Sequence, residues 1–442
     1  MEQMKRLTFE EQKRRTENIA EVENGNKSFR YRHRIKDYMP GQVYYTLGEY
    51  PSYIKFAPTE YDHRILKEIA DNGADFIQIH MEWIDIMRYV GGDKFTCPDP
   101  DGMKEFVKAA HAHGLKVIAY ISSGFFEMTD PDYTEDFKPS NPLIELYYHL
   151  GRCSASSPEW ISYIMPRIES LLDTYGFDGL YNDLGTPDLG EDSTHLSRVY
   201  NEDMMYRIYN MIKARGGIYK IHISGPHGIP YDEKVYDYIW VGEGCKNYAE
   251  FDKTRNHKPY VVPVIDSRHI PDTDPDEQYT HFIPFLQFPM LKYGRPRTGA
   301  LLDFEIDGID WAEETCTIHT RKIKEWYESH KNGPYCYSEW SATPDNPLAI
   351  ESWYKYLALY KEMVTEGSIC HIDIKETDLV KSQIPEKIAV STFTNEKIYM
   401  AASNLSDEDY ILELAEEWTD RITGVKSNKF VIKPNKMALL VK

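Results

Sequence analysis

Two carboxylates in this sequence occupy positions from which they could act as a nucleophile or as an acid–base group. Asp183 ends the run Gly-Leu-Tyr-Asn-Asp at 179–183, and Glu243 follows the run Tyr-Ile-Trp-Val-Gly at 238–242. In both cases an acid stands at the C-terminal end of a short apolar stretch that is typical of a β-strand. One such acid can attack an electrophilic carbon or activate water while the other donates a proton. The alternative is structural: Asp183 could cap the following loop, and Glu243 could serve a turn or an ion pair.

The sequence segments that carry these acids belong to a regular alternation of two types. From residue 41, short apolar runs alternate with amphipathic helical stretches, which is typical of βαβ units around a parallel sheet. Helices are expected over Tyr61–Asn72 and Gly102–His113, and after the cap Ser157-Pro158-Glu159. The sequence predicts eight strands, at Val43–Thr46, Phe76–His80, Val117–Ser122, Gly179–Asn182, Lys220–Ser224, Tyr238–Val241, Val261–Ile265 and Ala300–Phe304.

These eight strands predict an α/β fold, a (β/α)₈ TIM barrel with a small C-terminal antiparallel β-domain. The strands span about 260 residues, a usual size for a closed barrel. An open doubly wound sheet is the competing architecture, but no Gly-rich phosphate loop follows the first strand. We expect a lead-in over 1–40, the barrel with trailing helices over 41–375, and a β-sandwich-like domain over 376–442. The trailing helices are expected at Glu313–His330 and Pro347–Glu366.

Short strands separated by turns are expected from Lys387 to the end of the chain. They lie at Lys387–Phe393, Ile398–Ser403, Tyr410–Leu414, Phe430–Ile432 and Met437–Val441.

The active site of such a barrel lies at the C-terminal ends of its strands. The residues there are rich in carboxylates, with aromatic and hydrogen-bonding groups beside them, and this combination is suited to hydrolysis of a glycosidic bond. We therefore predict Asp183 and Glu243 as catalytic. The substrate-binding candidates are Glu82, Trp83, Asn182, His222, Asp266, Arg268 and Asp303.

Other barrel chemistries fit less well. Phosphorylated substrates would require Gly-rich loops after the last two strands, and a metal-dependent amidohydrolase would require His-x-His after the first. The first strand ends Tyr45-Thr46-Leu47-Gly48, and His111-Ala112-His113 lies at a helix end. We therefore expect no metal and no cofactor.

The composition restricts the partners. With 71 acidic and 51 basic residues the net charge is −20, which argues against nucleic acid and against an anionic membrane surface as partners. No apolar run is long enough to span a membrane, and the charged segment from Met1 to Arg15 is no signal peptide. Six scattered cysteines favour free thiols. We expect a cytoplasmic protein with a carbohydrate substrate, able to form a homodimer.

A family resemblance adds to this interpretation. The segments Gly176–Asp183, His113–Tyr120 and Ser157–Trp160 resemble parts of retaining barrel-fold α-glycoside hydrolases, and the nearest group is the superfamily of α-galactosidases and α-N-acetylgalactosaminidases. The resemblance implies an aspartate nucleophile at Asp183 and an acid/base at the end of strand six. That position is Glu243 here, where the family more often has aspartate.

Two alternatives from other classes stay open. A non-catalytic carbohydrate-binding barrel would have an aromatic cleft without a second acid in reach of the first. A barrel lyase or isomerase acting on a sugar acid would need a Lys, Tyr or His base and a basic clamp, for which Arg268 and His269 are the candidates.

Overall fold

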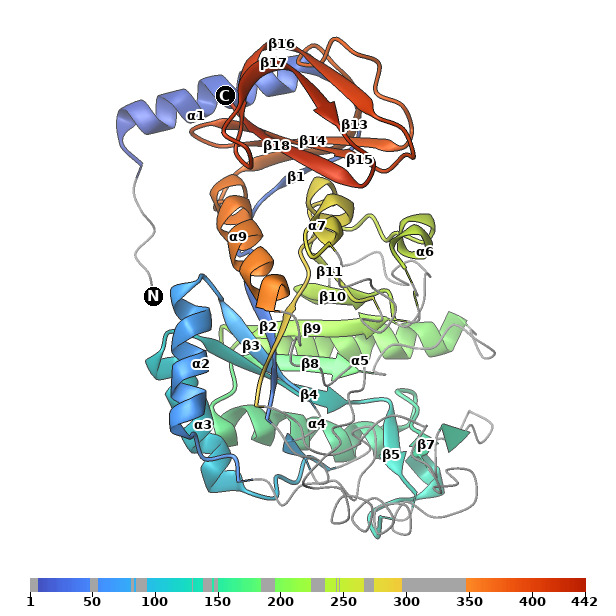
Figure 1. Cartoon of the computed structure of the whole chain (residues 1–442). Helices are drawn as coiled ribbons and strands as arrows, with labels where there is room; N and C mark the ends of the chain where they lie inside the picture. Colours follow the sequence, from blue (N-terminus) through green and yellow to red (C-terminus); the bar gives the residue numbers. More distant parts are fainter. Residues whose placement is uncertain are drawn as a thin grey trace.

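A parallel eight-stranded sheet forms the centre of the larger part of the molecule (Figure 1). The computed structural model describes residues 7–47, 55–80, 83–84, 94–128, 130–137, 145–146, 150–183, 195–223, 235–243, 245, 247–265, 274–295 and 347–442. The sheet order is β11-β10-β9-β8-β4-β3-β2-β12. The strands are β2 (Gln42–Thr46), β3 (Phe76–Ile79), β4 (Lys116–Ser122), β8 (Gly179–Asp183), β9 (Ile218–Ile223), β10 (Tyr238–Val241), β11 (Val261–Pro263) and β12 (Leu291–Gly294).

Seven of the eight predicted strands are confirmed, and the eighth strand of the sheet in the described part of the chain is β12. Strand β12 at Leu291–Gly294 pairs in parallel with β2, matching Leu291 to Val43 and Gly294 to Thr46. The segment predicted as the eighth strand, Ala300–Phe304, is outside the described residues. Because β12, the last strand of this sheet in chain order, pairs with β2, the first, the sheet curls on itself.

The helices α2 to α4 follow the predicted periodicity, and their ends show why they form there. In α4 (Pro158–Tyr175), Ser157 Oγ accepts the Trp160 amide at 3.0 Å, and Gly176 ends the helix with φ 75°. The connecting helices are α2 (Glu60–Asp71), α3 (Pro100–Ala112), α5 (His195–Lys213), α6 (Tyr248–Lys253), α7 (Glu277–Phe282) and the 3₁₀ turns η3 (Glu135–Phe137) and η5 (Ile283–Phe285). No described helix is long and apolar enough to cross a membrane.

A second sheet is antiparallel and combines the two ends of the chain. Its order is β1-β13-β14-β15-β18-β16-β17, and helix α1 (Phe9–Gly25) lies beside it (Figure 1). Its strands are β1 (Asn26–Arg34), β13 (Ile369–Thr377), β14 (Ile388–Thr394), β15 (Ile398–Asn404), β16 (Tyr410–Asp420), β17 (Lys426–Ile432) and β18 (Lys436–Val441). The five predicted C-terminal strands are confirmed, whereas β1 and β13 were not predicted.

The two sheets share one hydrophobic core, which also includes helix α9 (Pro347–Met363). Trp353 of this helix is buried and donates from Nε1 to the Pro289 carbonyl at 3.0 Å. From the second sheet, Ser391 Oγ donates to the Pro284 carbonyl. The helix predicted over Pro347–Glu366 is therefore confirmed, while the one predicted over Glu313–His330 lies outside the described residues. A small sheet of β5 (Phe125–Glu127), β6 (Glu145–Leu146) and β7 (Leu150–Arg152) follows β4.

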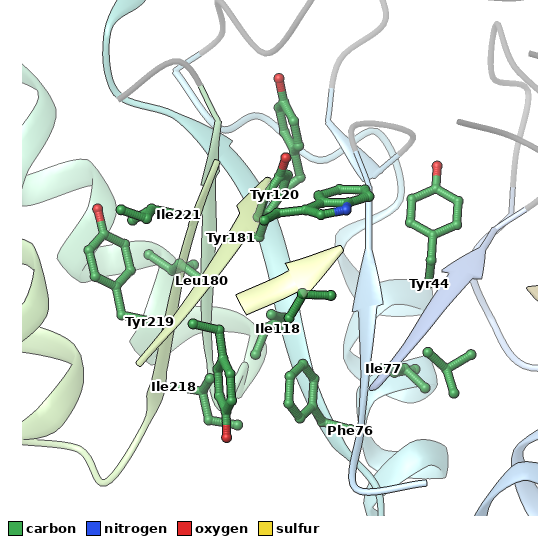
Figure 2. Packing of buried hydrophobic residues seen from close by; sticks show 14 of the residues in the cluster. Tyr44, Phe76, Ile77, Ile118, Tyr120, Leu180, Tyr181, Ile218, Tyr219 and Ile221 are labelled. Atoms are coloured by element: carbon green, nitrogen blue, oxygen red, sulfur yellow. The ribbon is translucent and has the colours of Figure 1, made fainter. Parts of the chain in front are cut away.

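Aromatic side chains fill the layers of the parallel sheet. Tyr44, Tyr120 and Tyr181 are almost completely buried and project from three strands of this sheet (Figure 2). Successive side chains of a strand alternate between its faces, so Tyr181 shares a face with Asp183, and Lys220 shares one with His222. The residues that form the candidate site therefore lie directly above a packed aromatic layer.

Candidate active site

Asp183 is the last residue of β8 and lies beside the end of β4. The register pairs Tyr181 with Tyr120 and Asp183 with Ser122. The Tyr120 hydroxyl donates to Asp183 Oδ2 at 3.0 Å, and His222 Nδ1 lies 2.7 Å from Asp183 Oδ1. Both carboxylate oxygens are thus held by groups from neighbouring strands, while 13% of the side chain remains exposed.

The surroundings keep Asp183 ionised. Burial alone would raise the pKa of this carboxyl, because a low-dielectric environment disfavours the charged form. The charge and hydrogen bond of His222 oppose that effect, together with His80 and the Tyr120 hydroxyl, and the net result is a pKa below the usual aspartate value. An ionised carboxylate at the end of a strand is available as a nucleophile or as a base.

Glu243 reaches the same histidine from the other side. Its Oε2 lies 3.1 Å from His222 Nε2, an ion-pair contact, and 34% of the Glu243 side chain is exposed. Gly242, just before it, has φ 114°, and a Cβ there would lie 2.3 Å from the Val264 carbonyl oxygen. Glycine at 242 is therefore required for β10 to pass close to the residues after β11 and to present Glu243 at the strand end.

His222 links the two acids. Its side chain is 4% exposed, and it is the residue of β9 that follows Ile221, the partner of Asn182 in β8. Burial would lower the pKa of this imidazole, but Asp183 and Glu243 together raise it above the ordinary histidine value. The three residues form a row in which the His222 imidazolium lies between Asp183 and Glu243.

Aromatic rings form the floor beneath these residues. The His80 ring lies 4.5 Å from the Tyr120 ring, and the Tyr181 ring lies 5.1 Å from the Trp240 ring. Trp240 also packs against His222, with ring centroids 5.8 Å apart. This floor excludes water from below, which strengthens the electrostatic interactions of the acids above it.

Lys220 lies one layer below His222 on the same strand and is fully buried. Its Nζ contacts Gln42 Oε1 at 3.1 Å and Met290 Sδ at 2.8 Å, and it lies 5.0 Å from the Trp240 ring. These are neutral groups, so burial holds the pKa of the Lys220 amine well below its ordinary value.

The predicted site residues divide into three groups. Asp183, Glu243 and His222 come together as described above. Asn182 is buried on the opposite face of β8, where its amide donates to Ser123 Oγ and to the Tyr219 hydroxyl, both at 2.7 Å. Trp83 is also fully buried and donates from Nε1 to the Tyr120 carbonyl at 2.9 Å. The remaining candidates lie outside the described residues: Glu82, Asp266, Arg268 and Asp303.

Two residues of the site, Tyr120 and His80, were absent from the predicted set. Tyr120 stands two residues before Ser122, which the sequence places at the end of β4. The alternation of strand side chains puts both on one face, and this signal could have identified Tyr120. His80 follows β3 directly, but nothing in the sequence indicates its position against the Tyr120 ring.

The described part of the chain contains no group of three His, Cys, Asp or Glu residues arranged to hold a metal ion. The two histidines of the His111-Ala112-His113 run have other contacts. His111 Nε2 lies 2.7 Å from Asp178 Oδ2, and His113 Nε2 lies 3.2 Å from His63 Nδ1.

Solved structures share this architecture. An α-glucosyl transfer enzyme, XgtA, matches with a TM-score of 0.56 at 12% identity, covering 91% of this chain and 99% of its own. An Anoxybacillus α-amylase matches with a TM-score of 0.54 at 11% identity, covering 86% and 89%. A GH36 α-galactosidase, AgaA from Geobacillus stearothermophilus in complex with 1-deoxygalactonojirimycin, matches with a TM-score of 0.51 at 12% identity, covering 90% of this chain and 55% of that one.

At these identities the likeness shows the fold. The chain has the curled parallel sheet, surrounding helices and additional β-sheet in an arrangement similar to these amylase and galactosidase structures. No protein-family model and no curated protein sequence matches the chain.

Proposed function

We propose that this protein is a glycoside hydrolase that cleaves an α-glycosidic bond on a closed (β/α)₈ barrel. The observation that carries the proposal is the contact of two strand-end carboxylates, Asp183 and Glu243, with the same buried histidine. Fold similarity to α-amylase and α-galactosidase structures supports an α-linked carbohydrate as substrate. Within this group we favour the α-galactosidase-like superfamily, on the strand-four and strand-six positions of the two acids.

The two acids have different roles in the proposed reaction. Asp183, which its neighbours hold ionised, attacks the anomeric carbon while Glu243 gives its proton to the departing oxygen. The C–O bond to the leaving group breaks as the bond to Asp183 forms. Glu243 then accepts a proton from water, whose oxygen displaces Asp183 and completes hydrolysis. The greater exposure of Glu243 is suited to exchange of protons with substrate and water.

The other residues of the predicted site complete the proposal. Substrate hydroxyls are expected to contact Glu82, Asp266, Arg268 and Asp303. Asn182 and Trp83 support the strands behind the site through the hydrogen bonds described above.

The position of Glu243 also bears on the non-catalytic alternative. A carbohydrate-binding barrel without activity would have no second acid near the first, whereas Glu243 and Asp183 here contact opposite nitrogens of one imidazole. This arrangement favours catalysis.

Inversion of configuration is the second candidate, and the intervening imidazole is the observation that favours it. Retaining pairs are separated by about 5–5.5 Å and inverting pairs by about 6.5–9.5 Å, and a ring between the acids is compatible with the wider spacing. Proton NMR of the first anomer released would decide: the α-anomer from an α-glycoside supports retention, and the β-anomer shows inversion.

The function itself is tested with aryl α- and β-glycosides of galactose, N-acetylgalactosamine, glucose and fucose. We expect turnover of at least one α-glycoside, and loss of it on the order of 10³-fold or more in Asp183→Asn and Glu243→Gln. Asp178→Asn is the matched control, because Asp178 precedes the same strand at its opposite end and accepts the Val117 amide at 2.8 Å. Near-normal turnover by Asp183→Asn would overturn the assignment, and so would activity confined to β-glycosides.

A further inference from the structure

His222 contacts a carboxylate at each of its ring nitrogens. Nδ1 lies 2.7 Å from Asp183 Oδ1, and Nε2 lies 3.1 Å from Glu243 Oε2. The sequence predicted a substrate-binding role for this histidine. With a carboxylate within ion-pair distance of each nitrogen and only 4% of the side chain exposed, the ring is poorly placed to bind a sugar hydroxyl.

We propose that His222 is a positioning residue that remains an imidazolium throughout the reaction and stabilises the negative charge as it passes from Asp183 to Glu243. The proposal rests on the proposed glycosidase function and assigns a role in it to a third residue. His222 neither bonds to the substrate nor exchanges a proton in this scheme. It acts through the two acids.

The charge balance of the reaction gives the reason. Before attack, Asp183 carries the negative charge and Glu243 carries the proton. When Asp183 bonds to the anomeric carbon it becomes a neutral ester, and Glu243, having given its proton to the leaving oxygen, becomes the carboxylate. The pair therefore holds one negative charge before and after the step. In the inverting alternative Asp183 takes a proton from water instead, and the charge moves in the same direction.

A fixed cation between the acids matches this movement. The negative charge leaves Asp183, which lies beside Nδ1, and appears on Glu243, which lies beside Nε2. The imidazolium therefore contacts an ionised carboxylate both before and after the step. Preorganised charges of this kind stabilise a transition state because they need no reorientation as the charge develops, and they act strongly in a water-excluded site.

The other titratable groups around the ring are consistent with a cationic His222. From β8, Tyr181 packs beside it, and burial raises the pKa of that hydroxyl well above its ordinary value. From its own strand, Lys220 is a buried amine with a lowered pKa. Tyr120 of β4 and His80 after β3 act on Asp183, and both lower its pKa. The raised pKa of His222 itself follows from Asp183 and Glu243.

The first experiment compares the pH dependence of kcat/KM in the wild type and His222→Gln, with the aryl glycoside that proves active. Removal of the cation raises the pKa of Asp183, so we expect the acidic limb of the bell-shaped profile to move to higher pH. We also expect the maximum rate to fall on the order of 10²-fold. Loss of a histidine with a merely structural role would lower the rate and leave the acidic limb in place, and that result would overturn the proposal.

The matched control is His281→Gln. His281 is also buried and is also bonded to an aspartate, Asp252, at 2.8 Å, but its contacts lie in α6 and α7 rather than in the site. We expect its profile to keep the wild-type limbs. Loss of turnover in Asp183→Asn and Glu243→Gln with an unmoved acidic limb in His222→Gln would reject the role of His222 and leave the glycosidase function standing. An active Asp183→Asn would instead reject the function.

A second measurement does not depend on activity. In wild-type protein with ¹⁵N-labelled histidine, we expect the His222 imidazole to carry protons on both nitrogens at neutral pH and above. Its assignment comes from the loss of that signal in His222→Gln, or from the change of that signal in Asp183→Asn if His222→Gln does not fold. A neutral His222 ring at pH 7 would overturn the proposal.

Discussion

The Tyr120 hydroxyl and the Asp183 carboxylate face each other at the ends of adjacent strands, with 3.0 Å between the donor and Oδ2. Tyr120 is fully buried, and its ring packs against His80 and Tyr181. The ring and the hydroxyl thus have separable roles: the ring belongs to the aromatic floor, and the hydroxyl stabilises the ionised form of Asp183.

Tyr120→Phe should separate these roles. The ring remains, so the thermal unfolding temperature should change little, while one hydrogen bond to the carboxylate is lost. We expect the acidic limb of kcat/KM to move to higher pH and the rate to fall about tenfold, as for loss of a hydrogen bond to a charged group. An unchanged acidic limb would show that the hydroxyl does not influence the ionisation of Asp183.

The pair of Asp183 and His222 should make stability depend on pH at both ends of the range. The lowered pKa of Asp183 contributes stability above the ordinary aspartate value, and this contribution is lost as the pH falls through the lower, folded-state value. The raised pKa of His222 contributes stability that is complete below about pH 6.5 and is lost as the pH rises towards the folded-state value.

Urea unfolding measured from pH 2 to pH 10 in wild type and His222→Gln checks this dependence. The wild type should lose more stability than the variant between neutral and alkaline pH. Equal alkaline losses in the two proteins would mean that His222 has no raised pKa in the folded state.

The fold could be predicted where local patterns determine it. The segment ending in Asp183 combines a capped helix, a glycine turn and a buried strand, and each of these features is encoded within a few residues. Strand β1 is different, because its sequence Asn-Lys-Ser-Phe-Arg-Tyr-Arg-His-Arg is polar and mostly exposed. Its pairing with β13 joins Arg34 to Ile369, a contact between distant parts of the sequence that no local pattern contains. Strand β12 is short, with a half-buried lysine at 292, and has little strand character.

The site could be predicted in part for the same reason. Strand ends identify Asp183, Glu243 and His222 individually, because the ends of parallel strands meet at one edge of a sheet. The contact of both acids with His222 depends on how far β8, β9 and β10 extend relative to one another. That relationship follows from the register, which pairs Trp240 with His222 and Asn182 with Ile221.

The lowered pKa of Lys220 should reduce the stability of the folded protein at neutral pH, whereas the raised pKa of His222 should increase it. The unfolded chain binds a proton at this amine up to about pH 10.4, whereas the buried amine has a much lower pKa, so folding is penalised at neutral pH. Lys220→Met keeps the apolar stem and removes the amine. We expect the variant to gain stability relative to wild type at pH 7, with the difference shrinking as the pH approaches 10.

Differential scanning calorimetry at several pH values measures the Lys220→Met difference. Lys108→Met, at an exposed position of α3, is the control and should show no such trend. A difference between Lys220→Met and wild type that stays constant with pH would contradict the assignment of a lowered pKa to Lys220.

Arg295 should contribute to stability through the planar arrangement of its guanidinium donors as well as through its charge. It follows β12 and pairs with the fully buried Asp62, whose oxygens lie 2.8 and 2.9 Å from Nη2 and Nε. Its guanidinium also donates to four backbone carbonyls beyond β2, those of Leu47, Lys55, Phe56 and Ala57. An ammonium group cannot reproduce this planar set of donors.

Arg295→Lys should therefore be strongly destabilising although the charge is kept. Breaking a buried ion pair costs about 3–5 kcal/mol, and we expect Arg295→Ala to fall in this range and Arg295→Lys to lose at least half as much. Equilibrium urea unfolding provides the measurement, with Arg215→Lys as the control at an ion pair with Asp173, which is largely exposed and should contribute less than about 1 kcal/mol. Equal stability of wild type and Arg295→Lys would show that charge alone, rather than the geometry of the guanidinium donors, holds this part of the chain against β12.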